Sequence, residues 1–89
     1  MKTIRLIIKG KVQGVYFRTS AKKTADQLKI SGWVKNLPDR DVEIKATSSD
    51  ELLEKFIEWC KQGPPRAIVN EVVIEELQPE SFSGFQIIG

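Results

Sequence analysis

The sequence predicts an α+β fold of the ferredoxin-like type, in which two helices cover one face of an antiparallel sheet. Segments with alternating apolar residues, typical of strands, are interleaved with two segments whose apolar residues recur every three to four positions, typical of helices. Their order is β-α-β-β-α-β, followed by a short fifth strand. Because 89 residues suffice for one small core, we expect a single domain over residues 1–89.

The first half of the chain predicts a strand, a helix and a hairpin. Apolar and polar side chains alternate over residues 3–9, which is typical of a strand. A helix is expected to begin near Arg18, and its apolar stripe is formed by Phe17, Ala21, Ala25 and Leu28. Residues 30–36 and 42–46 again read as strands, and the Pro-containing turn at residues 37–41 joins them into a hairpin.

The second half predicts a second helix and two strands. Ser48 and Glu51 have the spacing of a capping box, so the helix is expected to begin here. Its apolar stripe is formed by Leu52, Leu53, Phe56, Ile57 and Cys60. The Gly-Pro-Pro sequence at residues 63–65 is expected to end it. Residues 67–77 and 82–88 are expected to be the last strands.

Composition excludes several kinds of site. The sequence contains no histidine, which excludes His-based nucleophiles, His acid–base pairs and Cys/His zinc sites. A single cysteine cannot form an internal disulfide and agrees with a reducing compartment. No apolar run approaches membrane-spanning length, and the N-terminus does not resemble a signal peptide. We therefore expect a cytoplasmic protein with no membrane partner.

Charge is distributed unevenly along the chain. Residues 1–40 hold ten Lys and Arg against two acids, a balance of +8, whereas residues 41–89 hold four against ten, a balance of −6. A basic half fits the steering of a small anionic substrate. Solvated charged faces explain any single lysine equally well. Nucleic-acid binding through this half is not expected, because the first strand offers aliphatic residues and lysines rather than several stacking aromatics.

The most informative stretch is GKVQGVYFR, residues 10–18, which links the first strand to the first helix. Gly10 and Gly14 permit a tight turn that points consecutive N–H groups inward. The helix N-terminus adds free donors and the positive end of its dipole. Arg18 adds a planar group with a permanent positive charge. These groups together predict a cradle for a dianion of the size of phosphate.

This stretch also resembles the first signature of the acylphosphatases, in the form G-x-V-Q-G-V-x-F-R. The sequence GWVKN at residues 32–36 resembles the beginning of their second signature. Residues 63–65 and the sequence GFQI at residues 84–87 resemble the family as well. The resemblance covers nearly the whole chain in the right order, and its two separate motifs make it specific.

The resemblance implies hydrolysis of acyl phosphates to a carboxylate and inorganic phosphate, without metal or other cofactor. The expected partners are therefore small molecules: an acyl phosphate as substrate, and inorganic phosphate or similar anions as product or inhibitor. By the same resemblance, Arg18 and Asn36 are the catalytic residues, and Asn36 orients the attacking water. The resemblance also implies that the phosphoryl group is held by Gln13, Gly14, Val15, Tyr16, Phe17 and Arg18, with Gln13 contributing its backbone.

The chain departs from the family pattern at two positions. It has Arg40 and Ser48 where the second signature normally has glycines. Arg40 is expected either to take a left-handed backbone conformation at some cost or to lie in a turn of another type. Both positions lie away from the residues assigned to catalysis, so we expect them to affect stability and turn shape more than activity.

Each assignment has a structural alternative. Arg18 could be a surface residue of the helix that pairs with an acid. Asn36 could close the hairpin turn. Trp33 and Trp59 are expected to pack in the core or at the helix–sheet edge rather than stack on bases. A non-catalytic module that binds anions or docks onto a partner would use the same fold, although we expect a free, monomeric enzyme.

A second phosphatase motif is present but is not expected to function. Cys60 and Arg66 have the C-x₅-R spacing of cysteine-dependent phosphatases. However, Pro64 and Pro65 lack the N–H donors that such a loop requires. Cys60 is also expected at the C-terminal end of a helix, where the dipole raises rather than lowers the pKa of a thiol. We therefore expect a buried core residue.

Overall fold

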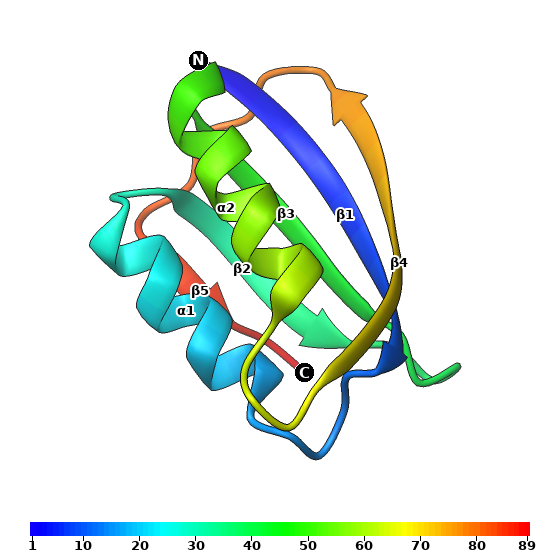
Figure 1. Ribbon diagram of the computed structural model, residues 1–89. Coiled ribbons are helices and arrows are strands. Elements are labelled where there is room, and N and C mark those ends of the chain that lie inside the picture. The colour runs from blue at the N-terminus through cyan, green and yellow to red at the C-terminus, as the bar shows by residue number, and fades with distance from the viewer.

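A computed structural model, which describes residues 1–89, shows two helices packed on one face of a five-stranded sheet (Figure 1). The elements are β1 (Lys2–Lys11), α1 (Phe17–Gln27), β2 (Ser31–Asn36), β3 (Val42–Ser48), α2 (Asp50–Gln62), β4 (Ile68–Leu77) and β5 (Phe85–Ile87). The strand order across the sheet is β4-β1-β3-β2-β5, which confirms the predicted ferredoxin-like fold. No helix is both long enough and apolar enough to cross a membrane.

One pairing differs from the expected antiparallel sheet. Strand β5 lies parallel to β2, with Gly32 opposite Phe85 and Val34 opposite Ile87. The reason is the path of the chain after β4. Figure 1 shows that the segment between β4 and β5 crosses the end of the sheet at which β2 begins, so that both strands run away from that end. The sheet is therefore mixed.

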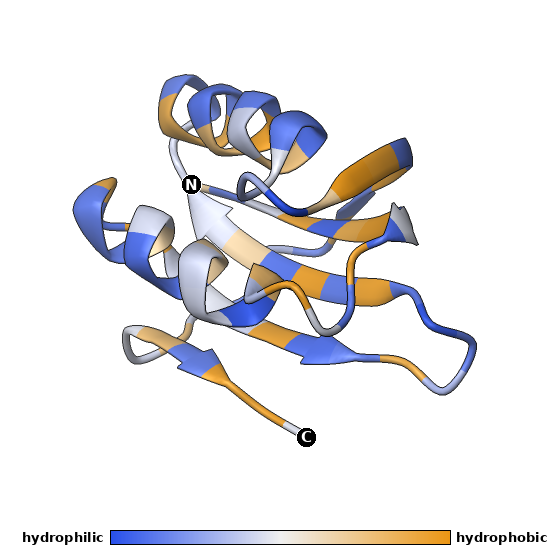
Figure 2. Ribbon diagram, turned by 60° about the horizontal axis from the view of Figure 1, so that its bottom comes forward, coloured by the Kyte–Doolittle hydropathy of each residue, from blue (hydrophilic) through white to orange (hydrophobic).

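The core lies between the sheet and the two helices. Alternation along β1 buries Ile4, Leu6 and Ile8 beneath the helices, as predicted. Phe17 of α1 and Phe56 of α2 meet them from the opposite side. Figure 2 shows this arrangement as hydrophobic segments that alternate with hydrophilic ones along the strands.

The capping residue of α2 corrects the sequence prediction. Strand β3 extends through Ser48, which pairs with Lys2 and is only 2% exposed. Ser49 is the N-cap instead, and its side chain accepts a hydrogen bond from the backbone N–H of Leu52 at 3.3 Å. The prediction that Ser48 and Glu51 form a capping box was wrong because the strand continues two residues further than its alternation suggested.

The two tryptophans have different environments. Trp59 lies at the helix–sheet edge as expected, with its ring 5.3 Å from that of Phe17 and 6.2 Å from that of Phe56, measured between centroids. Trp33 corrects the prediction, because it lies half-buried on the sheet face that no helix covers. There the ammonium group of Lys35 lies 5.2 Å from its ring centroid, close enough for a cation–π contact.

Replacement of Gly32 is expected to cost considerable stability. Its φ is +147°, and an added Cβ would lie 1.9 Å from the backbone oxygen of Lys45 on the neighbouring strand. Because β2 and β3 would have to separate, we expect Gly32→Ala to lower the free energy of unfolding by about 3 kcal/mol. Gly14→Ala serves as the comparison: a Cβ there meets nothing within 4 Å, so we expect a loss of about 1 kcal/mol from its positive φ alone. Denaturant unfolding of both variants checks this prediction, and equal losses would contradict it.

Candidate active site

The loop between β1 and α1 is held by apolar side chains and exposes its backbone. Val12, Val15 and Phe17 are buried in the core. Between these anchors, Gly14 and Tyr16 have left-handed backbone conformations, with φ of 73° and 65°. Left-handed residues at alternate positions turn successive N–H groups toward one side, which is how anion-binding concavities are built. Tyr16 is 72% exposed, so burial of its side chain does not account for its backbone conformation.

The N–H groups of this loop are free. No backbone N–H from Gln13 to Thr19 donates to an acceptor within the protein. The N-terminus of α1 has no side-chain cap and no acidic residue in its first turn. The N-terminus of α2 has both, because Ser49 caps it and two acids follow. The start of α1 therefore keeps its donors and the positive end of its dipole available to an external anion.

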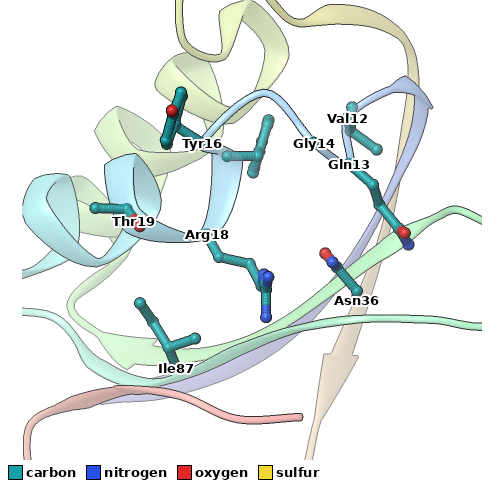
Figure 3. Close-up of a pocket in the computed structure, with 9 residues that line it drawn as sticks. Val12, Gln13, Gly14, Tyr16, Arg18, Thr19, Asn36 and Ile87 are labelled. Carbon is teal, nitrogen blue, oxygen red and sulfur yellow. The ribbon is translucent and has the colours of Figure 1, made fainter.

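A cavity of about 440 Å³ lies beside this loop. It is lined by Val12, Gln13, Gly14, Tyr16, Phe17, Arg18, Thr19, Asn36 and Ile87. Figure 3 shows the side chains of Arg18 and Asn36 extending into the space next to the loop, from α1 and from the end of β2. Of the residues predicted to form the site, all line this cavity except Val15, which is buried.

The register of the sheet explains why Asn36 reaches the loop. Val42 of β3 pairs with Ile8 of β1 on one side and with Asn36 of β2 on the other. Asn36 therefore lies level with the last buried residue of β1, where the chain is about to enter the loop. Residues distant in the sequence thus meet at one end of the sheet.

Arg18 has no acidic partner. Its guanidinium takes part in no salt bridge with an acidic side chain, and its one hydrogen bond is from Nη1 to an oxygen of Gly89, the last residue of the sequence, at 3.4 Å. The alternative that Arg18 pairs with an acid on the helix surface is therefore wrong. Its charge is directed into the cavity, and no acidic side chain of the protein pairs with it.

Asn36 is not used to close the hairpin turn. The turn is closed by two backbone hydrogen bonds, from Leu37 N–H to the Asp41 oxygen at 2.8 Å and from Arg40 N–H to the Leu37 oxygen at 3.2 Å. The carboxylate of Asp39 also accepts from the N–H of Asp41 at 3.1 Å. The side chain of Asn36 makes no hydrogen bond within the protein, so its amide is free to bind a molecule in the cavity.

Comparison with known proteins agrees with this geometry. The family model Acylphosphatase matches residues 4–87. An acylphosphatase of Thiobacillus denitrificans is 44% identical over 86 residues, covering 97% of this chain and 96% of that protein. The chain belongs to the acylphosphatase family. An acylphosphatase of Trichormus variabilis is 42% identical over 84 residues, covering 94% of this chain and 83% of that protein. The crystal structure of an acylphosphatase from Bacillus subtilis superposes with a TM-score of 0.97 at 38% identity, covering all of both chains.

The two departures from the acylphosphatase pattern have different structural consequences. Arg40 has a left-handed φ of 77°, so the first of the two expected alternatives holds and the turn keeps a conformation that favours glycine. Its side chain is exposed and lines a neighbouring cavity that shares Val12, Gln13 and Gly14 with the first. Ser48 does not have a positive φ and simply ends β3.

Gln13 does more than the acylphosphatase resemblance implied. Its side-chain Nε2 donates to the backbone oxygens of Leu37 and Asp41, each at 2.9 Å. The sequence prediction assigned only its backbone to the site. No pattern along the chain signals this contact, because Gln13 and its acceptors are brought together only by the pairing of β1, β3 and β2.

The acid at the end of the hairpin is paired. Lys9 Nζ lies 2.7 Å from Asp41 Oδ2, and this hydrogen bond, reinforced by the charge of Asp41, raises the pKa of Lys9 above its ordinary value. The carboxylate of Asp41 is therefore paired with Lys9 and is not free to act on a molecule in the cavity. The structure contains no group of three or more cysteine or acidic side chains arranged to hold a metal ion.

The second phosphatase motif does not form a site. Cys60 lies in α2, is fully buried, and its sulfur is surrounded by core residues. Burial raises the pKa of its thiol far above the ordinary value, because a thiolate there would lose its hydration. The prediction that Cys60 is a core residue is confirmed.

Proposed function

We propose that this protein hydrolyses the carboxyl–phosphate bond of acyl phosphates, giving a carboxylate and inorganic phosphate. One observation carries the proposal: the free N–H groups of residues 13–19, the guanidinium of Arg18, which pairs with no acidic side chain, and the unpaired amide of Asn36 converge on one cavity. The first two suit a phosphoryl group and the third suits a water beside it. Membership of the acylphosphatase family supports the same reaction.

The phosphoryl group is held by the loop and by Arg18. The backbone N–H groups from Gln13 to Phe17 and the guanidinium of Arg18 donate hydrogen bonds to its non-bridging oxygens. Charge on these oxygens is the feature that phosphoryl transfer must stabilise, and preorganised donors stabilise it without reorganising. These groups therefore contribute to both binding and turnover.

Asn36 orients the attacking water. Its side-chain oxygen accepts a hydrogen bond from the water, and the water oxygen faces phosphorus opposite the acyl oxygen. The new bond from water oxygen to phosphorus forms as the bond from phosphorus to the acyl oxygen breaks, and the electron pair leaves with the carboxylate. An amide is too weak a base to deprotonate the water, so this role is one of position.

The leaving group and the phosphate complete the reaction without a histidine. A carboxylate leaves without protonation at neutral pH, so no general acid is required. The proton lost by the water passes to an oxygen of the bound phosphate. An acyl phosphate analogue with less basic phosphoryl oxygens is therefore expected to react more slowly, and equal rates would contradict this route for the proton.

Hydrolysis of acetyl phosphate by the wild-type protein in the presence of a metal chelator tests the proposed function. We expect turnover that the chelator does not reduce, together with little turnover of an alkyl phosphate monoester, whose alkoxide leaving group requires protonation. Inorganic phosphate is expected to inhibit competitively. Phosphate binding without hydrolysis of any acyl phosphate would instead indicate a non-catalytic anion-binding module.

The site needs no second chain, since every group assigned to it comes from α1, β2 and the loop between β1 and α1. We therefore propose that the protein acts as a monomer, as a single domain over residues 1–89, in the cytoplasm. Sedimentation equilibrium is expected to give a mass near 10.1 kDa, and a mass twice as large would contradict the monomer.

A further inference from the structure

The side chain of Gln13 supplies the only hydrogen bonds that fasten the loop to the hairpin. Within residues 12–15 no backbone N–H or C=O group is bonded to the rest of the protein. The buried side chains of Val12 and Val15 hold the loop against the core, but apolar contacts are not directional. The two hydrogen bonds from Gln13 Nε2 are directional, and both end on the hairpin that follows Asn36.

The two acceptors lie opposite each other across the neck of the hairpin. Leu37 follows Asn36 directly, and the Asp41 oxygen also accepts from the N–H of Leu37 at 2.8 Å. Gln13 therefore contacts both chains of the hairpin at the position where β2 ends. On the far side, Lys9 of β1 holds the carboxylate of Asp41 at 2.7 Å. The neck of the hairpin is thus braced from the strand before the loop and from the loop itself.

The chemistry of the contact favours a carboxamide of this length. Both hydrogens of one nitrogen are used, one for each carbonyl oxygen. A glutamate at this position would place its carboxylate oxygens, which only accept hydrogen bonds, against the two backbone oxygens. An asparagine has the same amide but is one methylene shorter, and a methionine has a similar length but no donor.

We propose that Gln13 is a positioning residue whose side-chain amide fixes the distance between the anion-binding loop and Asn36. This inference rests on the proposed function and extends it. The loop holds phosphorus, and Asn36 holds the water that attacks it, so Gln13 sets the separation of the two reacting atoms. The cradle for phosphate is formed by the loop backbone and Arg18. The buried side chains of Val12, Val15 and Phe17 hold this loop in place, so the cradle does not depend on the side chain of Gln13.

The consequence is a selective loss of turnover. When the amide is removed, the loop still binds phosphate, but no hydrogen bond fixes its distance from the hairpin that follows Asn36. A misplacement of about 1 Å between reacting groups costs roughly 100-fold in rate. Substitution of a residue that only maintains the fold would instead reduce phosphate binding and turnover together, or would change neither as long as the protein stays folded.

The experiment compares Gln13→Met with Gln86→Met. Gln86 is the matched control, because its side chain also donates to a backbone oxygen, that of Ser83 at 3.4 Å, but makes no hydrogen bond to the loop or the hairpin and does not line the cavity. For Gln13→Met we expect kcat for acetyl phosphate to fall roughly 10- to 100-fold, while KM and the inhibition constant of inorganic phosphate change less than about threefold. Gln86→Met is expected to keep wild-type values.

A second measurement reports on the hairpin without using activity. Amide hydrogen exchange by NMR is expected to show faster exchange of the Leu37 N–H in Gln13→Met than in the wild type and in Gln86→Met. If Gln13→Met does not fold, Gln13→Asn, which keeps the amide on a shorter side chain, is expected to show the same selective fall in kcat.

Three results would overturn the inference: an unchanged kcat, an equal loss of phosphate affinity and kcat, or unchanged exchange at Leu37. These results can be distinguished from a failure of the proposed function, in which the wild-type protein itself would hydrolyse no acetyl phosphate. In that case exchange at Leu37 and phosphate affinity still decide whether Gln13 fastens the loop to the hairpin.

Discussion

Replacing Arg18 with alanine is expected to abolish both phosphate binding and turnover. The guanidinium is the only permanent positive charge that lines the cavity, and no acidic side chain pairs with it. The loop N–H groups that remain are neutral donors and cannot balance a dianion. We expect kcat/KM for acetyl phosphate to fall at least about 1000-fold, since loss of a single neutral donor to developing charge already costs 100- to 1000-fold.

The measurement for Arg18→Ala is hydrolysis of acetyl phosphate together with an NMR titration by inorganic phosphate. Lys23→Ala is the matched control, because it removes one positive charge from the exposed face of the same helix without touching the cavity. Lys23→Ala is expected to retain both properties. An Arg18→Ala variant that binds phosphate as tightly as the wild type would show that the loop backbone is sufficient and that the role given to Arg18 is wrong.

Replacing Asn36 with alanine is expected to remove turnover and to leave phosphate binding intact. The amide of Asn36 has no partner in the protein and closes no turn, so its loss disturbs neither the hairpin nor the loop. What is lost is the group that holds the water in line with the breaking bond. We expect kcat to fall about 100-fold or more, with the dissociation constant of phosphate within about twofold of the wild type.

Asn70→Ala is the matched control for this variant. Asn70 is an exposed asparagine of β4 that lies outside the cavity, so its replacement is expected to change neither kcat nor phosphate affinity. A normal kcat in Asn36→Ala would show that Asn36 does not orient the attacking water. A parallel loss of phosphate affinity would indicate that Asn36 binds the phosphoryl group.

The contrast between these two variants follows from where each side chain originates. Arg18 lies in the first turn of the helix whose N–H groups face the anion, whereas Asn36 lies at the end of a strand on the opposite side of the cavity. One residue therefore belongs to the anion cradle, and the other is brought to it by the sheet. Gln13 spans the two, which is why its expected effect on kcat resembles that of Asn36 more than that of Arg18.

Local patterns in the sequence were sufficient to predict most of the fold. The alternation in β1 correctly assigned Ile4, Leu6 and Ile8 to the core, and the glycine at position 63 ends α2 as predicted. Such features depend on the period of the side chains and on backbone preferences near each residue. The approach of Arg18 and Asn36 was expected for a different reason: the resemblance to acylphosphatases implied it, and the expected pairing of the strands made it possible.

The errors concern features that neighbouring elements decide. Ser48 stays in β3 because it pairs with β1, although its spacing from Glu51 favoured a helix cap. Strand β5 is parallel because the chain crosses to the far edge of the sheet. The side-chain contacts of Gln13 depend on tertiary structure alone, since its acceptors lie 24 and 28 residues away. None of these is encoded in a local pattern.

The central claim is that water oriented by Asn36 attacks phosphorus held by the loop and Arg18. Hydrolysis of acetyl phosphate in ¹⁸O-labelled water, with mass analysis of both products, tests this most directly. Attack at phosphorus breaks the bond between phosphorus and the acyl oxygen, so the account predicts one ¹⁸O atom in inorganic phosphate and none in acetate. Label in acetate would mean that water attacks the carbonyl carbon, and the geometry proposed for the loop, Arg18 and Asn36 would then be contradicted.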